Sequence, residues 1–123
     1  ALIFARDPTA GGAPARFAYM PYGRYDPSDV TALPNGDLLV LDRGFRLPFR
    51  FSARISRIDR RDVAAGRIAR GRLIATIDAP LIHDNFEGID TTIENGATIV
   101  WIVSDDNQLV LQRTLLLKFR LDR

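Results

Sequence analysis

The sequence predicts an all-β fold in which two blade-like antiparallel sheets form a partial β-propeller. A short apolar strand, an Asn-Gly pair and a longer apolar strand ending in Asp occur twice, around Asn35 and around Asn95. The two Asn residues are 60 positions apart, a spacing that suggests a repeated sheet. About eight strand-like segments and almost no helical periodicity indicate the same class. Two blades cannot close a ring, so we expect this chain to be a fragment of a longer one.

The first blade and one strand before it are expected within residues 16–78, after a loop or arm over residues 1–15 that holds several Pro and Gly. Asn35-Gly36 is a strong hairpin signal because both residues tolerate positive φ. The segment from Arg43 to Arg50 contains Gly44 and Pro48 and is predicted to be an exposed loop. The predicted strands are 16–20, 29–33, 37–42, 51–59 and 73–78. The strand 37–42 is rich in Leu and is expected to be buried on both faces.

The second blade is expected within residues 79–123 and is incomplete. Its predicted strands are 88–93, 98–104 and 114–121, with Asn95-Gly96 as the turn between the first two. No fourth strand follows. Trp101 lies in the middle of a predicted strand and is expected to be a core residue.

The composition limits the class of protein. A chain of 123 residues fits one domain and can bury a core. It has no cysteine, which excludes disulfides and thiolate metal sites. No apolar run approaches the roughly 20 residues that span a membrane, so we expect no membrane partner. The chain begins at Ala1 without a signal-like segment, and we expect a signal peptide to be absent or removed.

Charge is strongly partitioned along the chain. Residues 43–72 hold ten Arg against two Asp, a net charge of +8, whereas residues 73–112 hold seven acids and no Lys or Arg. One stretch is suited to anions and the other to cations. The alternative is that the Arg residues are solvated strand edges that oppose aggregation. We expect no nucleic-acid partner, because aromatics are sparse in the basic stretch and the acidic half repels phosphate.

Acidic loops are the predicted metal site. Clustered carboxylates and amides without His or Cys suit a hard cation such as calcium, which takes six to eight oxygen ligands. The alternative is that these are turn residues, since Asp and Asn hydrogen-bond their own backbone in turns. The candidate metal ligands are Asp84, Glu87, Asp105 and Asp106.

Arg43, Arg46 and Arg113 are the candidate anion-binding residues, because guanidinium groups bind phosphate through paired hydrogen bonds. Equivalent blade positions would present Arg from one blade beside acids from the next. Glu87 and His83 are the candidate catalytic residues; His83 is the only histidine, so any histidine-dependent mechanism must use it. A solvated or structural role for each of these residues is the alternative.

Five segments carry a family resemblance: Asp84-Asn85-Phe86-Glu87-Gly88-Ile89, Ser104-Asp105-Asp106-Asn107, Leu111 to Leu117, Leu33 to Asp37 and Leu41 to Phe45. Together they resemble the phytase-like family, known as "esterase-like activity of phytase", over roughly residues 25–122. The resemblance implies a β-propeller hydrolase of phosphate or carboxylic esters with calcium as its cofactor, and this chain is similar to the C-terminal portion of such a protein. It also implies a bacterial, periplasmic or secreted protein about three times longer.

Two functions therefore remain open from the sequence. The first is an ester hydrolase acting on a small-molecule ester or phosphate, with the isolated chain inactive because opposing blades would supply missing groups. The second is a non-catalytic β-propeller that serves as a binding or interaction module, because a fold does not fix a function. In both cases the expected protein partners are the remaining blades of a parent chain or further copies of this chain.

Overall fold

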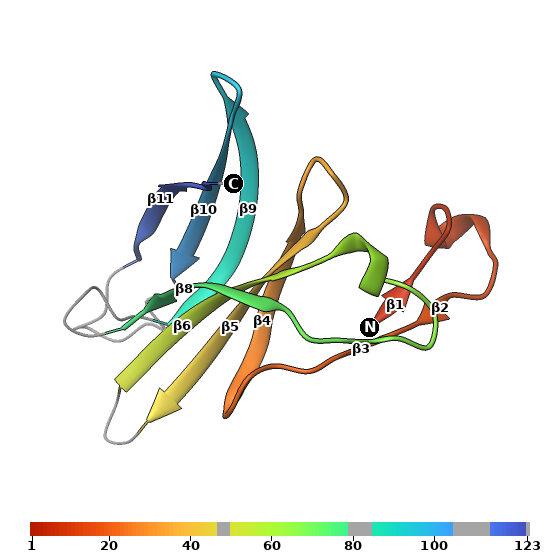
Figure 1. Cartoon of the computed structure of the whole chain (residues 1–123), viewed down its shortest axis with the longest axis horizontal. Helices are drawn as coiled ribbons and strands as arrows, with labels where there is room; N and C mark the ends of the chain where they lie inside the picture. The colour runs from red at the N-terminus through yellow and green to blue at the C-terminus, as the bar shows by residue number, and fades with distance from the viewer. Residues whose placement is uncertain (47–49, 79–84, 105–113, 123) are drawn as a thin grey trace.

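A computed structural model describes residues 1–46, 50–78, 85–104 and 114–122 and is all-β (Figure 1). The helical structure in these residues consists of 3-10 turns at Pro8–Ala10 and Arg60–Asp62. No helix in these ranges is long and apolar enough to cross a membrane. The strands are β1 (Leu2–Ile3), β2 (Ala15–Arg16), β3 (Ala18–Tyr19), β4 (Tyr25–Ala32), β5 (Leu38–Arg46), β6 (Arg50–Ile58), β7 (Ile68–Ala69), β8 (Arg72–Ile77), β9 (Phe86–Glu94), β10 (Ala97–Ser104) and β11 (Leu116–Arg120).

The first sheet consists of β4, β5, β6 and β8, antiparallel and in that order. Its first turn contains the predicted Asn35-Gly36 pair. Gly36 has a φ of 91°, which glycine adopts without the penalty that a side chain would bring. The Asp37 N–H donates to Asn35 Oδ1 at 2.9 Å and fixes the turn. The hairpin predicted at this position is confirmed.

The second sheet consists of β9, β10 and β11, also antiparallel. Asn95 and Gly96 have φ values of 49° and 77°, as a two-residue type I′ hairpin requires. Glu94 and Ala97 face each other directly across this turn. The predicted all-β class with two antiparallel sheets is confirmed, and the arrangement is consistent with two neighbouring blades of a propeller.

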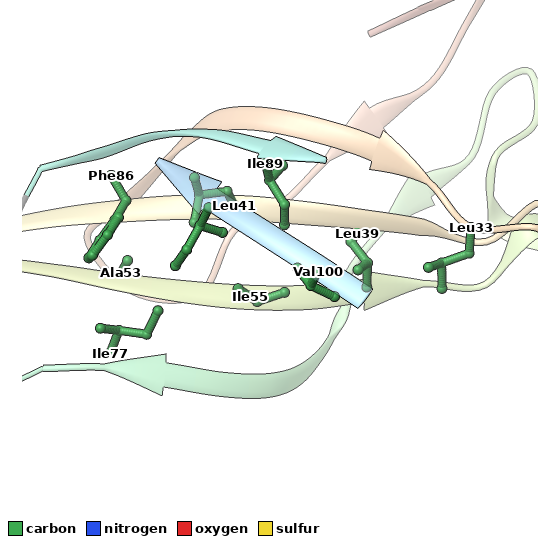
Figure 2. Close-up of a cluster of buried hydrophobic side chains, with 10 residues drawn as sticks. Leu33, Leu39, Leu41, Ala53, Ile55, Ile77, Phe86, Ile89 and Val100 are labelled. Carbon is green, nitrogen blue, oxygen red and sulfur yellow. The ribbon is translucent and has the colours of Figure 1, made fainter. Parts of the chain in front are cut away.

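The main core lies between the two sheets. Strand side chains alternate between faces, so Leu39 and Leu41 of β5 point toward the second sheet while Val40 points the other way. All three are at most 4% exposed, which confirms burial on both faces of this strand. Figure 2 shows side chains from both sheets converging in this layer: Leu33, Leu39, Leu41, Ala53, Ile55, Ile77, Phe86, Ile89 and Val100.

The first strands of the two sheets, β4 and β9, are direct neighbours. Their contact includes side chain to backbone hydrogen bonds. Ile89 N–H donates to Asp29 Oδ2 at 2.8 Å, and Thr91 Oγ1 donates to the Ala32 carbonyl at 3.2 Å. These partners are 60 and 59 residues apart. The sequence separation between bonded residues of the two sheets is therefore close to the 60-residue spacing of the two Asn-Gly pairs.

The N-terminal segment covers the rear of the first sheet, meaning the face turned away from the second sheet. Phe17 and Tyr19 pack around Val40 and Ile58. The single strand predicted over residues 16–20 is divided in two, because β2 pairs with β1 whereas β3 pairs in parallel with β7. Each of these partner strands has only two residues, so neither can extend the pairing across the whole segment.

The prediction of an exposed loop from Arg43 to Arg50 is wrong at both ends, because β5 continues to Arg46 and β6 begins at Arg50. The hairpin is extended by a cross-strand ring pair, with the Phe45 and Phe51 centroids 5.1 Å apart. Gly44 lies within the strand rather than ending it. A Cβ there would stand 2.9 Å from the Tyr25 ring, so the glycine permits close packing.

Trp101 is another correction to the sequence prediction. It is half-buried on the outward face of the second sheet, because alternation along β10 sends Val100 and Ile102 into the core instead. Its Nε1 donates to Thr92 Oγ1 at 2.8 Å, and Lys118 Nζ lies 4.9 Å from its ring centroid.

Candidate functional site

Arg43, Asn85 and Glu87 form a polar group, the Arg43 cluster, where the first sheet meets the start of β9. Arg43 Nη1 lies 3.4 Å from Asn85 Oδ1 and 3.5 Å from Glu87 Oε1. Asn85 Nδ2 donates to the same Glu87 oxygen at 2.8 Å. The structure thus brings together one residue predicted to bind an anion and one predicted to bind a metal.

Local structure explains why these side chains meet. Arg43 follows Leu39 and Leu41 at alternate positions of β5, so it points to the same side of the sheet as these core residues. Phe86 is fully buried and fixes the start of β9 against the first sheet. Its neighbours Asn85 and Glu87 are consequently held beside Arg43, with Asn85 only 5% exposed.

The ion pair in the Arg43 cluster is partly solvated. The Arg43 and Glu87 side chains are 48% and 40% exposed. Such a pair contributes at most about 1 kcal/mol to stability, so its main effect is to orient the guanidinium. Both contacts use Nη1, and no other hydrogen bond joins this guanidinium to a described residue. As far as the described residues go, its Nε and Nη2 donors are available to an anion.

A small hollow adjoins Arg43. Its volume is about 280 Å³, and its lining includes Asp26, Arg43, Gly44 and Phe51. Asp26 stands opposite Arg43 in the pairing of β4 with β5. Sequence reasoning missed Asp26, because only the pairing register shows that β4 begins before the predicted strand. Asp26 and Arg43 therefore occupy facing positions on neighbouring strands beside this hollow.

The other candidate residues lie outside the described residues or are described in part. His83, Asp84, Asp105, Asp106 and Arg113 are outside, and only the backbone of Arg46 is described, at the end of β5. Ser104 pairs with Phe86 and bonds the Leu115 backbone, so three chain segments meet there.

Glu87 is the single predicted calcium ligand within the described residues. The described part of the chain contains no group of three or more His, Cys, Asp or Glu suited to a metal ion. Glu87 Oε1 and Asn85 Oδ1, the nearest oxygen donors, both face the Arg43 guanidinium. A positive charge at this distance opposes a cation at the same point. The described donors therefore fit an anion at Arg43 better than calcium.

A second polar group lies on the rear face and has a structural role. Tyr19 OH donates to Asp42 Oδ2 at 2.6 Å and holds the N-terminal segment on the first sheet. Asp42 is 1% exposed, and burial raises the pKa of its carboxyl group although the Tyr19 hydrogen bond opposes this. Burial and the neighbouring carboxylate likewise raise the pKa of Tyr19. Asp42 Oδ1 and Ser56 Oγ are buried and have no hydrogen-bond partner among the residues that the structure describes.

Comparison with known proteins identifies a family for this arrangement. The phytase-like family, described as esterase-like activity of phytase, matches residues 1–108. This match includes both Asn-Gly hairpins and the whole Arg43 cluster, and it reaches further toward the N-terminus than the resemblance drawn from the sequence. No curated protein and no solved structure matches the chain. Because the family match covers most of its length, the chain belongs to the phytase-like family.

Proposed function

We propose that this chain contributes the anion-binding part of a hydrolase of phosphate or carboxylic esters, with Arg43 as the group that holds the substrate's negative charge. The supporting observation is the orientation of Arg43 by Glu87 and Asn85 with two donors left for a ligand. Family membership supports the reaction class. Paired hydrogen bonds from one guanidinium suit two oxygens of a phosphoryl or carboxyl group.

In this proposal Arg43 acts on the charge of the reacting group. Negative charge grows on the ester oxygens as water attacks, and a fixed guanidinium stabilises that charge without reorganisation. Glu87 and Asn85 are positioning residues, because they contact the guanidinium rather than the ester. We assign proton transfer to His83, which is the one imidazole in the sequence.

We also propose a calcium ion near this junction, held by Asp84, Asp105 and Asp106 together with Glu87 Oε2, because Glu87 Oε1 faces the Arg43 guanidinium. Support comes from the density of carboxylates in the sequence next to Ser104 and Phe86. A bound cation would offset the repulsion among these carboxylates. No step of the hydrolysis is assigned to this ion, because the described oxygen donors nearest to the junction, Asn85 Oδ1 and Glu87 Oε1, face the Arg43 guanidinium.

The test of the hydrolase proposal uses the natural protein that carries this chain, at its full length. Its hydrolysis of p-nitrophenyl phosphate, p-nitrophenyl acetate and phytate is measured for the wild type and for Arg43→Ala. The matched control is Arg72→Ala, which removes an exposed Arg that lines a different cleft. We expect Arg43→Ala to lower kcat/KM by about 10- to 100-fold. Equal activity in both variants, or no hydrolysis by the wild type, would overturn the proposal.

One further outcome would distinguish a non-catalytic binding module from a hydrolase. Phosphate binding that depends on Arg43 without any ester hydrolysis would indicate a non-catalytic binding module. The calcium proposal has its own readout, which is a rise in melting temperature with calcium that Glu87→Gln reduces. An equal rise with magnesium, or none, would contradict a specific calcium site.

A further inference from the structure

The hollow beside Arg43 is bounded on one side by two aromatic rings. Phe45 of β5 and Phe51 of β6 face each other across the hairpin, with ring centroids 5.1 Å apart. Phe45, Arg43 and Leu41 occupy alternate positions of β5, so all three project from the same face of the sheet. Arg43 and both rings line the hollow. The guanidinium therefore stands next to an aromatic surface.

Phe45 is open to solvent although it belongs to the same face as the core. It is 50% exposed, whereas Leu39 and Leu41 of the same strand are fully buried. An aromatic ring is a rigid apolar surface, and it prefers a second ring in an offset or tilted arrangement. Phe51 already holds Phe45 in such a tilted pair. The exposed part of this pair can accept the flat apolar group of a ligand whose charged end lies on Arg43.

Two carboxylates accompany the single guanidinium. Asp26 stands opposite Arg43 in the pairing of β4 with β5, and residues paired in this way project from the same face. Asp26 lines the hollow, but no hydrogen bond joins it to Arg43, whose contacts go to Asn85 and Glu87. Among the described residues, one positive charge is therefore accompanied by the negative charges of Asp26 and Glu87.

This charge balance limits the kind of anion that suits the hollow. The guanidinium offsets one negative charge on a ligand, but a second charge is repelled by Asp26 and meets no further cation among the described side chains. The size of the hollow indicates the same preference. Its volume of about 280 Å³ is slightly below the roughly 300–1,000 Å³ of typical ligand pockets. It therefore suits one small group rather than a large polyanion.

Building on the proposed anion-binding role of Arg43, we propose that the hollow selects esters that carry at most one negative charge and an aromatic group. The ester oxygens lie on Arg43, and the aromatic group packs against Phe45 and Phe51. Asp26 sets the specificity for charge, because its carboxylate disfavours the second charge of a phosphate monoester or a polyphosphate. None of these three residues takes part in bond making or breaking, so each acts on the choice of substrate.

The test is the binding of three anions to the full-length natural protein, measured by ligand-observed nuclear magnetic resonance with calcium held constant. Benzoate has one charge and a ring, and acetate has one charge and no ring. Phenyl phosphate has a ring and two charges at about pH 8, because its second proton dissociates with a pKa of about 6. We expect benzoate to bind roughly 2- to 10-fold more tightly than acetate. Phe45→Ala should remove this advantage, whereas Phe119→Ala, which removes a ring that is 42% exposed on β11, should keep it.

Asp26→Asn tests the specificity for charge, since it preserves the size of the side chain and removes its charge. A fixed charge acts about twice as strongly on a dianion as on a monoanion at the same place. We therefore expect the affinity for phenyl phosphate, relative to that for benzoate, to rise about 3- to 10-fold in Asp26→Asn. Asp122→Asn is the matched control, because the Asp122 side chain is 84% exposed and lines a different cleft. It should leave the ratio unchanged, and circular dichroism checks that every variant is folded.

The outcomes distinguish this specificity from the proposed function. If Arg43→Ala abolishes all binding but Asp26→Asn leaves the ratio unchanged, or benzoate and acetate bind equally, the specificity is overturned and the Arg43 anion site stands. If the wild type binds none of the anions, or Arg43→Ala binds them as the wild type does, both are overturned. The expected binding pattern in a protein that hydrolyses no ester would support the choice of ligand and overturn the hydrolase alone.

Discussion

Arg43 and Glu87 are 44 residues apart in the sequence, yet Arg43 Nη1 and Glu87 Oε1 lie 3.5 Å apart between the two sheets. The basic stretch and the acidic stretch of the chain meet at this point. Asn85 bonds both side chains and completes a small polar group beside the buried Phe86. This geometry presents a fixed guanidinium at the junction of the two repeats.

We expect Arg43→Lys to reduce anion binding while it leaves the fold intact. Lysine keeps the charge but loses the planar fork that contacts two oxygens together. Because the Arg43–Glu87 pair is half-exposed, its loss should change the free energy of unfolding by less than about 1 kcal/mol. Urea denaturation measures the stability and phosphate titration measures the binding. A large loss of stability with unchanged binding would show that Arg43 is structural.

Asp29→Asn should destabilise the contact between the sheets. Asparagine can still accept the Val30 N–H, but its amide group cannot also accept the Ile89 N–H that Asp29 Oδ2 receives. Leaving this half-buried donor without a partner should cost about 1–2 kcal/mol. The melting temperature should fall by roughly 3–5 °C per kcal/mol for a chain of this size. Calorimetry at low concentration checks this, and a melting temperature equal to that of the wild type would contradict it.

Leu41→Ala should be strongly destabilising because Leu41 is fully buried between the sheets. A cavity of this kind costs about 2–5 kcal/mol. Leu73→Ala is a matched control, since Leu73 is 46% exposed in β8 and its truncation should cost less than about 1 kcal/mol. Equal losses in urea denaturation would mean that the two sheets do not share this core.

Asp42→Asn should change how stability depends on pH. Burial raises the pKa of Asp42 in the folded state, so its favourable contribution is complete below the unfolded pKa of 3.8 and is lost as pH rises through the folded pKa. The wild type should therefore gain stability relative to Asp42→Asn as pH falls from 7 toward that range. Denaturation of both proteins across this pH range measures the difference. A difference that is independent of pH would show that Asp42 does not titrate in this way.

The repeated hairpins were predictable because their signal is local. Asn95 and Gly96 adopt positive φ for reasons that belong to these two residues. The uninterrupted apolar run from Leu38 to Leu41 in β5 already indicates burial on both faces. The extension of β5 beyond Arg43 was not predictable in this way. It depends on the Phe45–Phe51 pair and on the fit of Gly44 against Tyr25, which are contacts across strands. Pattern reasoning therefore treated the glycine as a strand end.

The site was predictable in its residue types but not in its pairing. Charge partition pointed to Arg43 and Glu87, because each follows or begins an apolar strand in its repeat. The contacts of Glu87 with Asn85 and with the Arg43 guanidinium depend on the packing of β4 beside β9, which the sequence pattern does not show. Asp26 and the role of Asp29 carry no motif in the sequence. They become visible only through the pairing of β4 with β5 and the contact of β4 with β9.

The most direct test of the Arg43 cluster as an anion site is a nuclear magnetic resonance titration of the chain with inorganic phosphate. We predict saturable shifts of the Asn85 and Glu87 backbone amides that Arg43→Ala removes and Arg72→Ala retains. Shifts that are absent, or that persist unchanged in Arg43→Ala, would contradict the assignment of Arg43 as the group that binds the anion.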